Sequence, residues 1–235
     1  MVARGGLHKH RDVQDGTARA AVFGISDGLV SNVSLILGIA GASTDPSIIR
    51  VAGISGLLAG AISMAAGEYV SLQAQKELVE RELLIEKKSI DTNLEDETAE
   101  LKAMYEERGI DSDLAGEVAR QIMSNSEIAL EVHIREELGV NPEQLGNPLM
   151  AAASSFVSFS FGAFVPLIPW LVGEGNSAIW TSAIVGIACT ALVGGVLAQL
   201  SGRSLFKTSL RQMLVAAGAC SATYLIGSLL GTSIG

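Results

Sequence analysis

The stretch from Val51 to Ser89 limits the folds open to this chain more than any other. It is apolar and glycine-rich through Ser63–Ser71, then continues as a charged helical pattern to about Glu86, and no proline interrupts it. As one helix of roughly 39 residues it would be on the order of 58 Å long, nearly twice the thickness of the hydrocarbon core of a bilayer. We therefore expect a helix that begins in a membrane and ends in water.

The composition indicates a membrane protein that carries an acidic soluble segment. The mean hydropathy is +0.40 and charged residues make up 17% of the 235 residues, below the roughly 25% that is usual in soluble domains. Residues 75–147 hold 19 acidic and 8 basic side chains, whereas the rest of the chain holds 6 and 8. Such a charge surplus attracts cations and repels nucleic acid.

Five segments are apolar and long enough to cross a bilayer. They cover about residues 18–42, 51–72, 149–172, 178–200 and 212–234. The first ends in small residues that imitate a signal-peptidase site, but Asp27 interrupts its apolar run, so we expect it to remain uncleaved. Basic residues precede the first segment and follow the fourth, at Arg4, Lys9, Arg11, Arg19, Arg203, Lys207 and Arg211. The positive-inside rule therefore predicts that the N-terminus and the acidic segment are cytoplasmic.

These patterns predict an all-α fold of five transmembrane spans with a cytoplasmic three-helix domain inserted between spans 2 and 3. We expect a cytoplasmic arm at 1–17, the first two spans within 18–74, the acidic insert at 75–147 and the last three spans within 148–235.

Within the insert, the first helix continues the second span to about Ile90, and the next two cover about 94–108 and 114–138. Its apolar anchors are few for its length: Leu78, Leu83, Ile85, Leu101, Met104, Ile122, Ile128 and Leu138. So small a core predicts help from a bound metal or from a second subunit.

Small residues recur every four positions in the last spans, and such faces let helices approach closely. The series are Gly186, Thr190, Gly194, Ala198 and Gly202 in one span, and Gly227, Gly231 and Gly235 in the next. They fit either packing within one chain or a dimer face.

Two acidic residues lie inside the predicted spans, Asp27 and Glu68. A carboxylate at membrane depth is costly and marks a candidate functional site. Glu68 follows Met64 by four residues, so a thioether and a carboxylate share one helix face, a pairing that suits a borderline transition metal better than Na⁺ or Ca²⁺. The alternative is a purely structural role, in which Glu68 marks the membrane interface and Met64 fills a packing gap.

The insert offers acidic pairs at helical spacing. Glu97 and Glu100 lie three residues apart, His133 and Glu137 lie four apart, and Glu86 belongs to the preceding helix. Each pair projects from one helix face, so three faces that meet could form an oxygen-rich site with one imidazole, apt for Fe²⁺, Mn²⁺ or Zn²⁺. Acidic surface helices also produce such pairs as plain solvated faces.

The sequence contains no catalytic motif that would suggest an enzyme instead of a metal-binding membrane protein. None of the three histidines follows a glutamate at the Glu-x-x-His spacing of di-iron oxidases. The chain has no phosphate-binding glycine loop, no Walker lysine and no nucleophile elbow. We therefore expect neither an enzyme nor a prosthetic group.

Four motifs carry a resemblance to a known family. They are Arg19–Val30 (RAAVFGISDGLV), Ser63–Ser71 (SMAAGEYVS), Tyr105–Gly109 (YEERG) and Glu136–Gly139 (EELG). With them the chain resembles the vacuolar iron transporter family, in a short bacterial-type form. The resemblance extends from Arg19 to the C-terminus.

The resemblance implies a homodimer of five-span protomers that exchanges cytosolic Fe²⁺, and often Mn²⁺ or another divalent metal, for protons. It implies a translocation path along Asp27 and Met64, with Glu68 close by. It also implies a metal-gathering role in the insert for Glu86, Glu97, Glu100 and Glu137.

Three positions depart from the pattern of that family. Ser89 stands where relatives usually carry a further ligating glutamate, and His133 with Ile134 replaces a methionine pair of plant-type relatives. His133 could replace a methionine as a ligand, whereas Ile134 could not. The number of metal ions in the insert and their identity, with Zn²⁺ and Co²⁺ as further candidates, stay open.

We expect a metal/proton antiporter that moves divalent metal out of the cytoplasm, in a bacterial cytoplasmic membrane. Protons and metal would compete for the same carboxylates. Two alternatives are a metal-sensing or metal-storing membrane scaffold, which would tolerate loss of Asp27, and a passive divalent cation channel, which would show no proton antiport.

Overall fold

A computed structural model describes residues 16–137, 139 and 146–234 of the chain. Within these residues every regular element is a helix, and five segments are long and apolar enough to cross a membrane, so the predicted all-α, five-span fold is confirmed. The basic N-terminal arm expected at 1–17 lies almost entirely outside the described residues. The chain divides into two compact units: the membrane unit, Met1–Val70 with Gly146–Gly235, and the insert unit, Ser71–Leu145.

Four of the five spans are uninterrupted helices. These are α1 (Gly16–Ala42), α2 (Pro46–Thr92), α8 (Gly175–Ser201) and α9 (Leu205–Ile234). The helix α2 begins in the membrane unit and continues without a break into the insert unit, as the absence of proline after its first residue predicts. The helix α9 begins seven residues before the expected span, so Lys207 and Arg211 lie in its first turns rather than in a loop.

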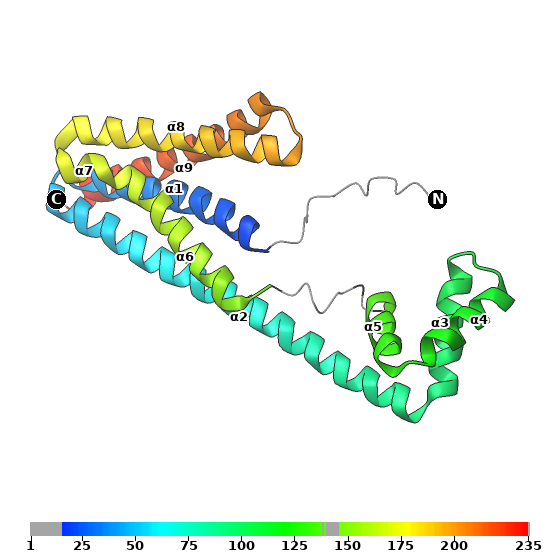
Figure 1. Ribbon diagram of the computed structural model, residues 1–235. Coiled ribbons are helices and arrows are strands. Elements are labelled where there is room, and N and C mark those ends of the chain that lie inside the picture. Colours follow the sequence, from blue (N-terminus) through cyan, green and yellow to red (C-terminus); the bar gives the residue numbers. More distant parts are fainter. Residues whose placement is uncertain (1–15, 138, 140–145, 235) are drawn as a thin grey trace, which may run out of the picture. The chain divides into compact units, whose positions relative to one another are not determined.

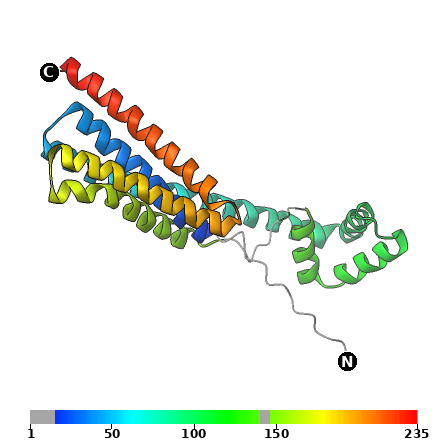
Figure 2. The same cartoon turned by 90° about the horizontal axis from the view of Figure 1, so that it is seen from above.

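The helix α1 is the centre of the membrane unit, where it lies beside α6, α8 and α9 (Figures 1 and 2). At several glycines the backbone of α1 and the backbone of a neighbouring helix contact each other directly. A Cβ at Gly28 would lie 2.9 Å from the backbone nitrogen of Ala163 and would overlap the carbonyl oxygen of Phe159. A Cβ at Gly227 of α9 would overlap the carbonyl oxygen of Gly38. Only glycine permits approaches this close, because any other residue places a Cβ there.

Several members of the small-residue series in the last two spans serve packing within the chain, whereas a Cβ at Gly202 would meet nothing within 4 Å and Gly235 lies outside the described residues. Gly186 of α8 faces Val33 of α1, and Gly194 faces the backbone of Ser209 on α9. Gly231 faces Ala42. Of the two explanations that the sequence allows, packing within one chain is the one that these contacts support.

The third span is broken, which its hydropathy alone does not predict. It consists of α6 (Pro148–Phe164), the 3₁₀ turn η2 (Val165–Leu167) and α7 (Ile168–Val172). Pro166 and Pro169 cause the break, because proline has no backbone N–H to donate and its ring crowds the preceding turn.

Side chains from three other helices donate to carbonyl oxygens of this broken segment. Asn32 of α1 donates to Ala163 at 2.6 Å and Ser182 of α8 donates to Pro166 at 2.5 Å. Arg50 of α2 donates to Trp170 at 2.6 Å. Backbone groups at membrane depth must find partners inside the protein, and these three donors supply them.

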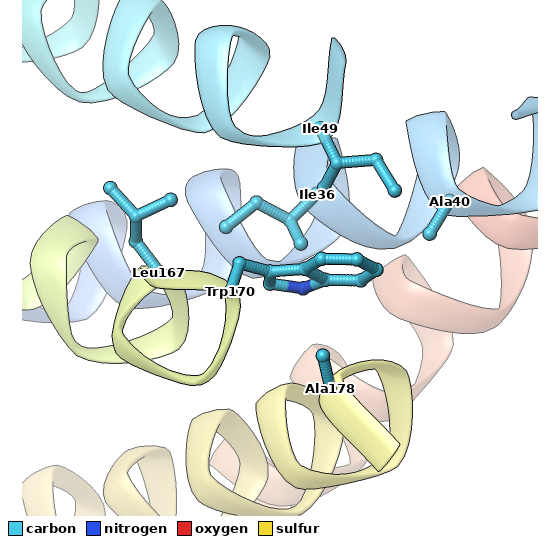
Figure 3. Close-up of a cluster of buried hydrophobic side chains, with 6 residues drawn as sticks. All are labelled: Ile36, Ala40, Ile49, Leu167, Trp170 and Ala178. Carbon is cyan, nitrogen blue, oxygen red and sulfur yellow. The ribbon is translucent and has the colours of Figure 1, made fainter. Parts of the chain in front are cut away.

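An apolar cluster holds the end of this segment in place (Figure 3). The Trp170 indole of α7 lies between Ile36 and Ile49 on one side and Ala178 on the other, and Leu167 lies next to it. All are buried. The break is therefore a packed feature of the fold and not a frayed helix end.

The insert unit contains more helices than the sequence predicts. After α2 come α3 (Leu94–Glu107), α4 (Ser112–Met123) and α5 (Ser126–Glu137), shown in green in Figure 1. The single third helix expected at 114–138 is wrong, because the chain turns between α4 and α5. Asn125 accepts hydrogen bonds from the backbone nitrogens of Glu127 and Ile128, so it caps a new helix at that point.

The core of the insert unit consists of Ile90, Leu101, Ala119, Met123 and Ala129. Of the anchors expected from sequence, Leu101 is fully buried, whereas Leu78, Ile85 and Ile128 are exposed. The core is therefore built largely from alanine and from residues near the helix junctions.

Candidate metal centre

The helices of the insert unit bring three carboxylates and one imidazole together. Glu86 comes from α2, Glu97 from α3, and His133 with Glu137 from α5. One potential ligand atom of each lies within 4.8 Å of those of the others. We call this group the carboxylate–imidazole cluster. A spread of this size allows all four residues to bind one ion.

His133 is the buried centre of the cluster, with a side chain that is 0% exposed. Its Nδ1 lies 3.1 Å from an oxygen of Glu86, 3.3 Å from one of Glu137 and 3.7 Å from one of Glu97. Its Nε2 is buried and has no hydrogen-bond partner among the described residues. The three carboxylates thus face the same ring nitrogen, which is the atom placed to bind a metal.

Among the described residues, no lysine or arginine forms an ion pair with the three carboxylates of the cluster, whose ion-pair partner is His133. Burial raises the pKa of Glu86 above its usual value, and the nearby Glu137, Glu97 and Glu100 raise it further, while His133 opposes them. Like charges gathered at a partly buried site repel one another, and a bound cation relieves that repulsion. The arrangement is therefore one that a divalent ion stabilises.

The local sequence explains how the Glu97 carboxylate is oriented. A single residue, Asn93, separates α2 from α3, so Ser89 near the end of α2 comes close to the first turn of α3. The Ser89 hydroxyl donates to Glu97, which fixes one oxygen of that carboxylate and leaves the other facing His133. The first turn of a helix also favours acidic side chains, because the helix dipole is positive there.

Arg108, just after α3, forms an ion pair with Glu136 of α5. Glu136 and Glu137 are consecutive, so the pair ties α5 to α3 beside the cluster and Glu137 remains free to face His133. The pair joins one charged residue from each of two sequence motifs, Tyr105–Gly109 and Glu136–Gly139.

The structure separates the predicted ligands of the insert into two groups. Glu86, Glu97, Glu137 and His133 meet in the cluster, whereas Glu100 is exposed and is not a member of it. Ile134 is buried and its aliphatic side chain offers no ligand. Sequence reasoning counted Ser89 only as a lost ligand and missed its hydrogen bond to Glu97.

The predicted path residues of the membrane unit lie in different surroundings. The Asp27 side chain is exposed on α1, and the Ser31 hydroxyl donates to the backbone carbonyl of Asp27. Met64 is half-buried on α2 and packs against the apolar cluster of Ala61, Phe159 and Ala163. Glu68 is also half-buried, one turn further along α2. Their roles in transport stay predictions.

A comparison with protein families gives a match that spans most of the chain, because residues 18–228 match the VIT family. The chain belongs to the VIT family. The family predicted from the four motifs is confirmed.

Several relatives are named vacuolar iron transporters. The vacuolar iron transporter of Acanthamoeba castellanii is 35% identical over 230 residues, which cover 96% of this chain and 83% of the relative. Vacuolar iron transporter 2 of Oryza sativa subsp. japonica is 30% identical over 207 residues, 88% of this chain and 84% of the relative. Vacuolar iron transporter homolog 1 of Arabidopsis thaliana is 31% identical over 216 residues. This VIT-family chain is a membrane transporter and not an enzyme.

Proposed function

We propose that this VIT-family protein moves divalent metal, Fe²⁺ and also Mn²⁺, out of the cytoplasm in exchange for protons. The observation that supports it most is the carboxylate–imidazole cluster, which belongs to the same chain as five candidate membrane spans. Carboxylate oxygens and one imidazole suit Fe²⁺, Mn²⁺, Zn²⁺ and Co²⁺. The printed names of the relatives point to iron.

In this mechanism the insert unit faces the cytoplasm and collects the metal, which then passes to Met64 and Asp27. The carboxylates of Asp27 and Glu68 each hold either a proton or a metal ion. Protons arriving from the far side of the membrane displace the metal, and this competition couples the two fluxes.

The proposal includes a homodimer. The Asp27 side chain is exposed on the single chain, and so is the neighbouring Phe23, within a span. A carboxylate that faces hydrocarbon is costly, whereas one that faces a second copy of the chain lines a protected path. The arrangement of α1 therefore favours a partner subunit over lipid at this position.

Transport by proteoliposomes with an imposed pH gradient tests the proposal. We expect Fe²⁺ and Mn²⁺ uptake that rises with the gradient and that Asp27→Ala abolishes. Glu174→Ala is the matched control, because it removes an exposed carboxylate outside the helices.

Each other outcome identifies one of the alternatives. Metal uptake that ignores the pH gradient would indicate a passive channel. Metal binding without uptake, unchanged in Asp27→Ala, would indicate a metal-sensing or metal-storing scaffold. A ranking of Fe²⁺, Mn²⁺, Zn²⁺ and Co²⁺ in the same assay gives the metal preference.

A further inference from the structure

A cavity of about 290 Å³ lies between the last two spans of the membrane unit. Its walls are one face of α8 and one face of α9, and Leu37 of α1 lies on its floor beside Cys220. Both floor residues are buried, whereas Trp180 and Tyr224, which also line the cavity, are 68% and 40% exposed. The cavity is therefore closed on the side of α1 and open toward the outside of the helix bundle.

The packing of α8 and α9 explains why this space exists. The two helices touch near the turn that connects them, because a Cβ at Gly194 would lie 2.8 Å from the Cα of Ser209. Further along, Ala178 of α8 joins the apolar cluster of the third span, whereas Gly227 of α9 lies against the backbone of α1. Figure 2 shows α8 and α9 separating from their connecting turn, with α1 between their far ends. The cavity is the wedge that these contacts leave.

The polarity of the lining falls from the end of the span toward its middle. Asn176 is the second residue of α8, so it lies at the end of the span, and Ile187 is the lining residue furthest from that end. The amphipathic rings of Trp180 and Tyr224 are of the kind that gathers at a membrane–water interface. Among the described residues, none that lines the cavity is charged. The lining thus matches a ligand with one polar end and a long neutral apolar part.

The dimensions of the cavity favour a single chain over a helix. The lining covers residues 176–187 of α8, which correspond to roughly 16 Å of helix. One leaflet contributes about half of the ~30 Å hydrocarbon core, so an acyl chain of that leaflet has a matching depth. One turn of an α-helix, about 10 Å across and 5.4 Å long, takes up on the order of 400 Å³ and exceeds the space available.

We propose that this cavity binds one acyl chain of a membrane phospholipid, whose head group lies at the Asn176 end. An unfilled apolar space forfeits dispersion contacts, and a chain that enters it contacts α1, α8 and α9 together. Because the lining is neutral, the site selects the chain and not the charge of the head group. Such a site depends on the membrane unit alone and not on the metal that is transported.

Filling the cavity tests the site by native mass spectrometry. Ala183→Leu combined with Ala217→Leu places two larger side chains in the cavity. Ala188→Leu combined with Ala222→Leu is the matched control, because it has the same mass and alters exposed positions of the same helices outside the lining. Each protein is purified in detergent and mixed with dioleoyl phosphatidylcholine. We expect the wild type and the control to retain one lipid, and the filled variant to retain roughly tenfold less, since its leucines occupy the space of several methylene groups.

A fluorescence titration examines the wild-type protein with the cavity unfilled. The chain has two tryptophans, of which Trp180 lines the cavity and Trp170 is 1% exposed. Phosphatidylcholine with brominated chains quenches a tryptophan that it contacts. We expect quenching in detergent that saturates near one lipid per protein, and Trp180→Phe should lose most of it.

The remaining outcomes would overturn the lipid site. Equal retention of lipid by the filled variant and the matched control is one, and quenching that rises linearly without saturation, as in simple mixing within micelles, is another. A second copy of the chain at this groove would give a dimer without lipid, which the filled variant separates and the control keeps. If the filled variant fails to fold, the titration of the wild type decides.

Discussion

The insert unit and the membrane unit bury polar groups in opposite ways. The insert unit gathers three carboxylates around one buried imidazole, so its closely spaced negative charges repel one another until a cation arrives. The membrane unit buries neutral donors, and Asn32 and Ser182 each cap one carbonyl oxygen of a broken helix. The first arrangement favours binding of an ion, whereas the second favours a defined fold through which an ion can pass.

The largest effect should come from the ligands of the insert. Glu97→Ala removes a member of the carboxylate–imidazole cluster, and we expect Mn²⁺ or Co²⁺ affinity to fall at least about 100-fold, or roughly 2.7 kcal/mol. Glu100→Ala removes the same charge from an exposed position on the same helix, and affinity should fall less than about tenfold. Calorimetric titration of the purified protein measures both. Equal losses would show that total charge, and not the cluster geometry, governs binding.

The next effect should come from helix packing in the membrane unit. Gly28→Ala places a methyl group against the backbone of α6, and we expect a loss of about 2 kcal/mol in the free energy of unfolding. Gly218→Ala in α9 is the control, because a Cβ there meets nothing within 4 Å. Thermal unfolding in detergent compares the two variants. A Gly28→Ala protein as stable as Gly218→Ala would contradict the backbone contact.

A smaller effect should follow from the residue that orients Glu97. Ser89→Ala removes the hydroxyl that donates to this carboxylate, and we expect metal affinity to fall roughly tenfold. Thr92→Ala is the control, since its hydroxyl bonds only to the backbone of α2, at the exposed end of that helix. If titration gave the same affinity for both variants, the hydrogen bond would have no part in binding.

The smallest effect should come from a single neutral cap in the membrane unit. Ser182→Ala leaves the Pro166 carbonyl without its donor, and we expect a cost of about 1 kcal/mol in stability with unchanged metal affinity. Ser177→Ala removes an exposed hydroxyl near the start of the same helix and should be neutral. A change in metal affinity for Ser182→Ala would show that the two units are not as independent as the comparison implies.

Sequence patterns predict the regular helices of this fold. They miss the positions at which a single residue interrupts a helix. Hydropathy locates the five spans, and the absence of proline after Pro46 predicts the continuity of α2. The break in the third span depends on Pro166 and Pro169, and their effect does not appear when hydropathy is averaged over a window of residues. The turn between α4 and α5 depends on the side chain of Asn125, because a polar residue within an acidic pattern leaves the helical period unchanged.

The candidate site was predictable in its residue types and not in its geometry. Glu97 and Glu100 are equivalent by spacing, yet only Glu97 meets His133, because a single residue separates α2 from α3 and the Ser89 hydroxyl of α2 holds the Glu97 carboxylate. Asn32 gives no sequence signal beyond a polar residue in an apolar span. Its role depends on the Ala163 carbonyl that it caps, which lies 131 residues further along the chain.

The glycine contacts of α1 also restrict how this helix can move. Where Gly28 meets Phe159 and Gly38 meets Gly227, two backbones touch and no side chains lie between them to change rotamer. Any displacement of α1 against α6 or α9 is therefore a sliding or rolling of whole helices, a class of motion that takes microseconds to milliseconds. A transport cycle in this protein would advance by such collective steps.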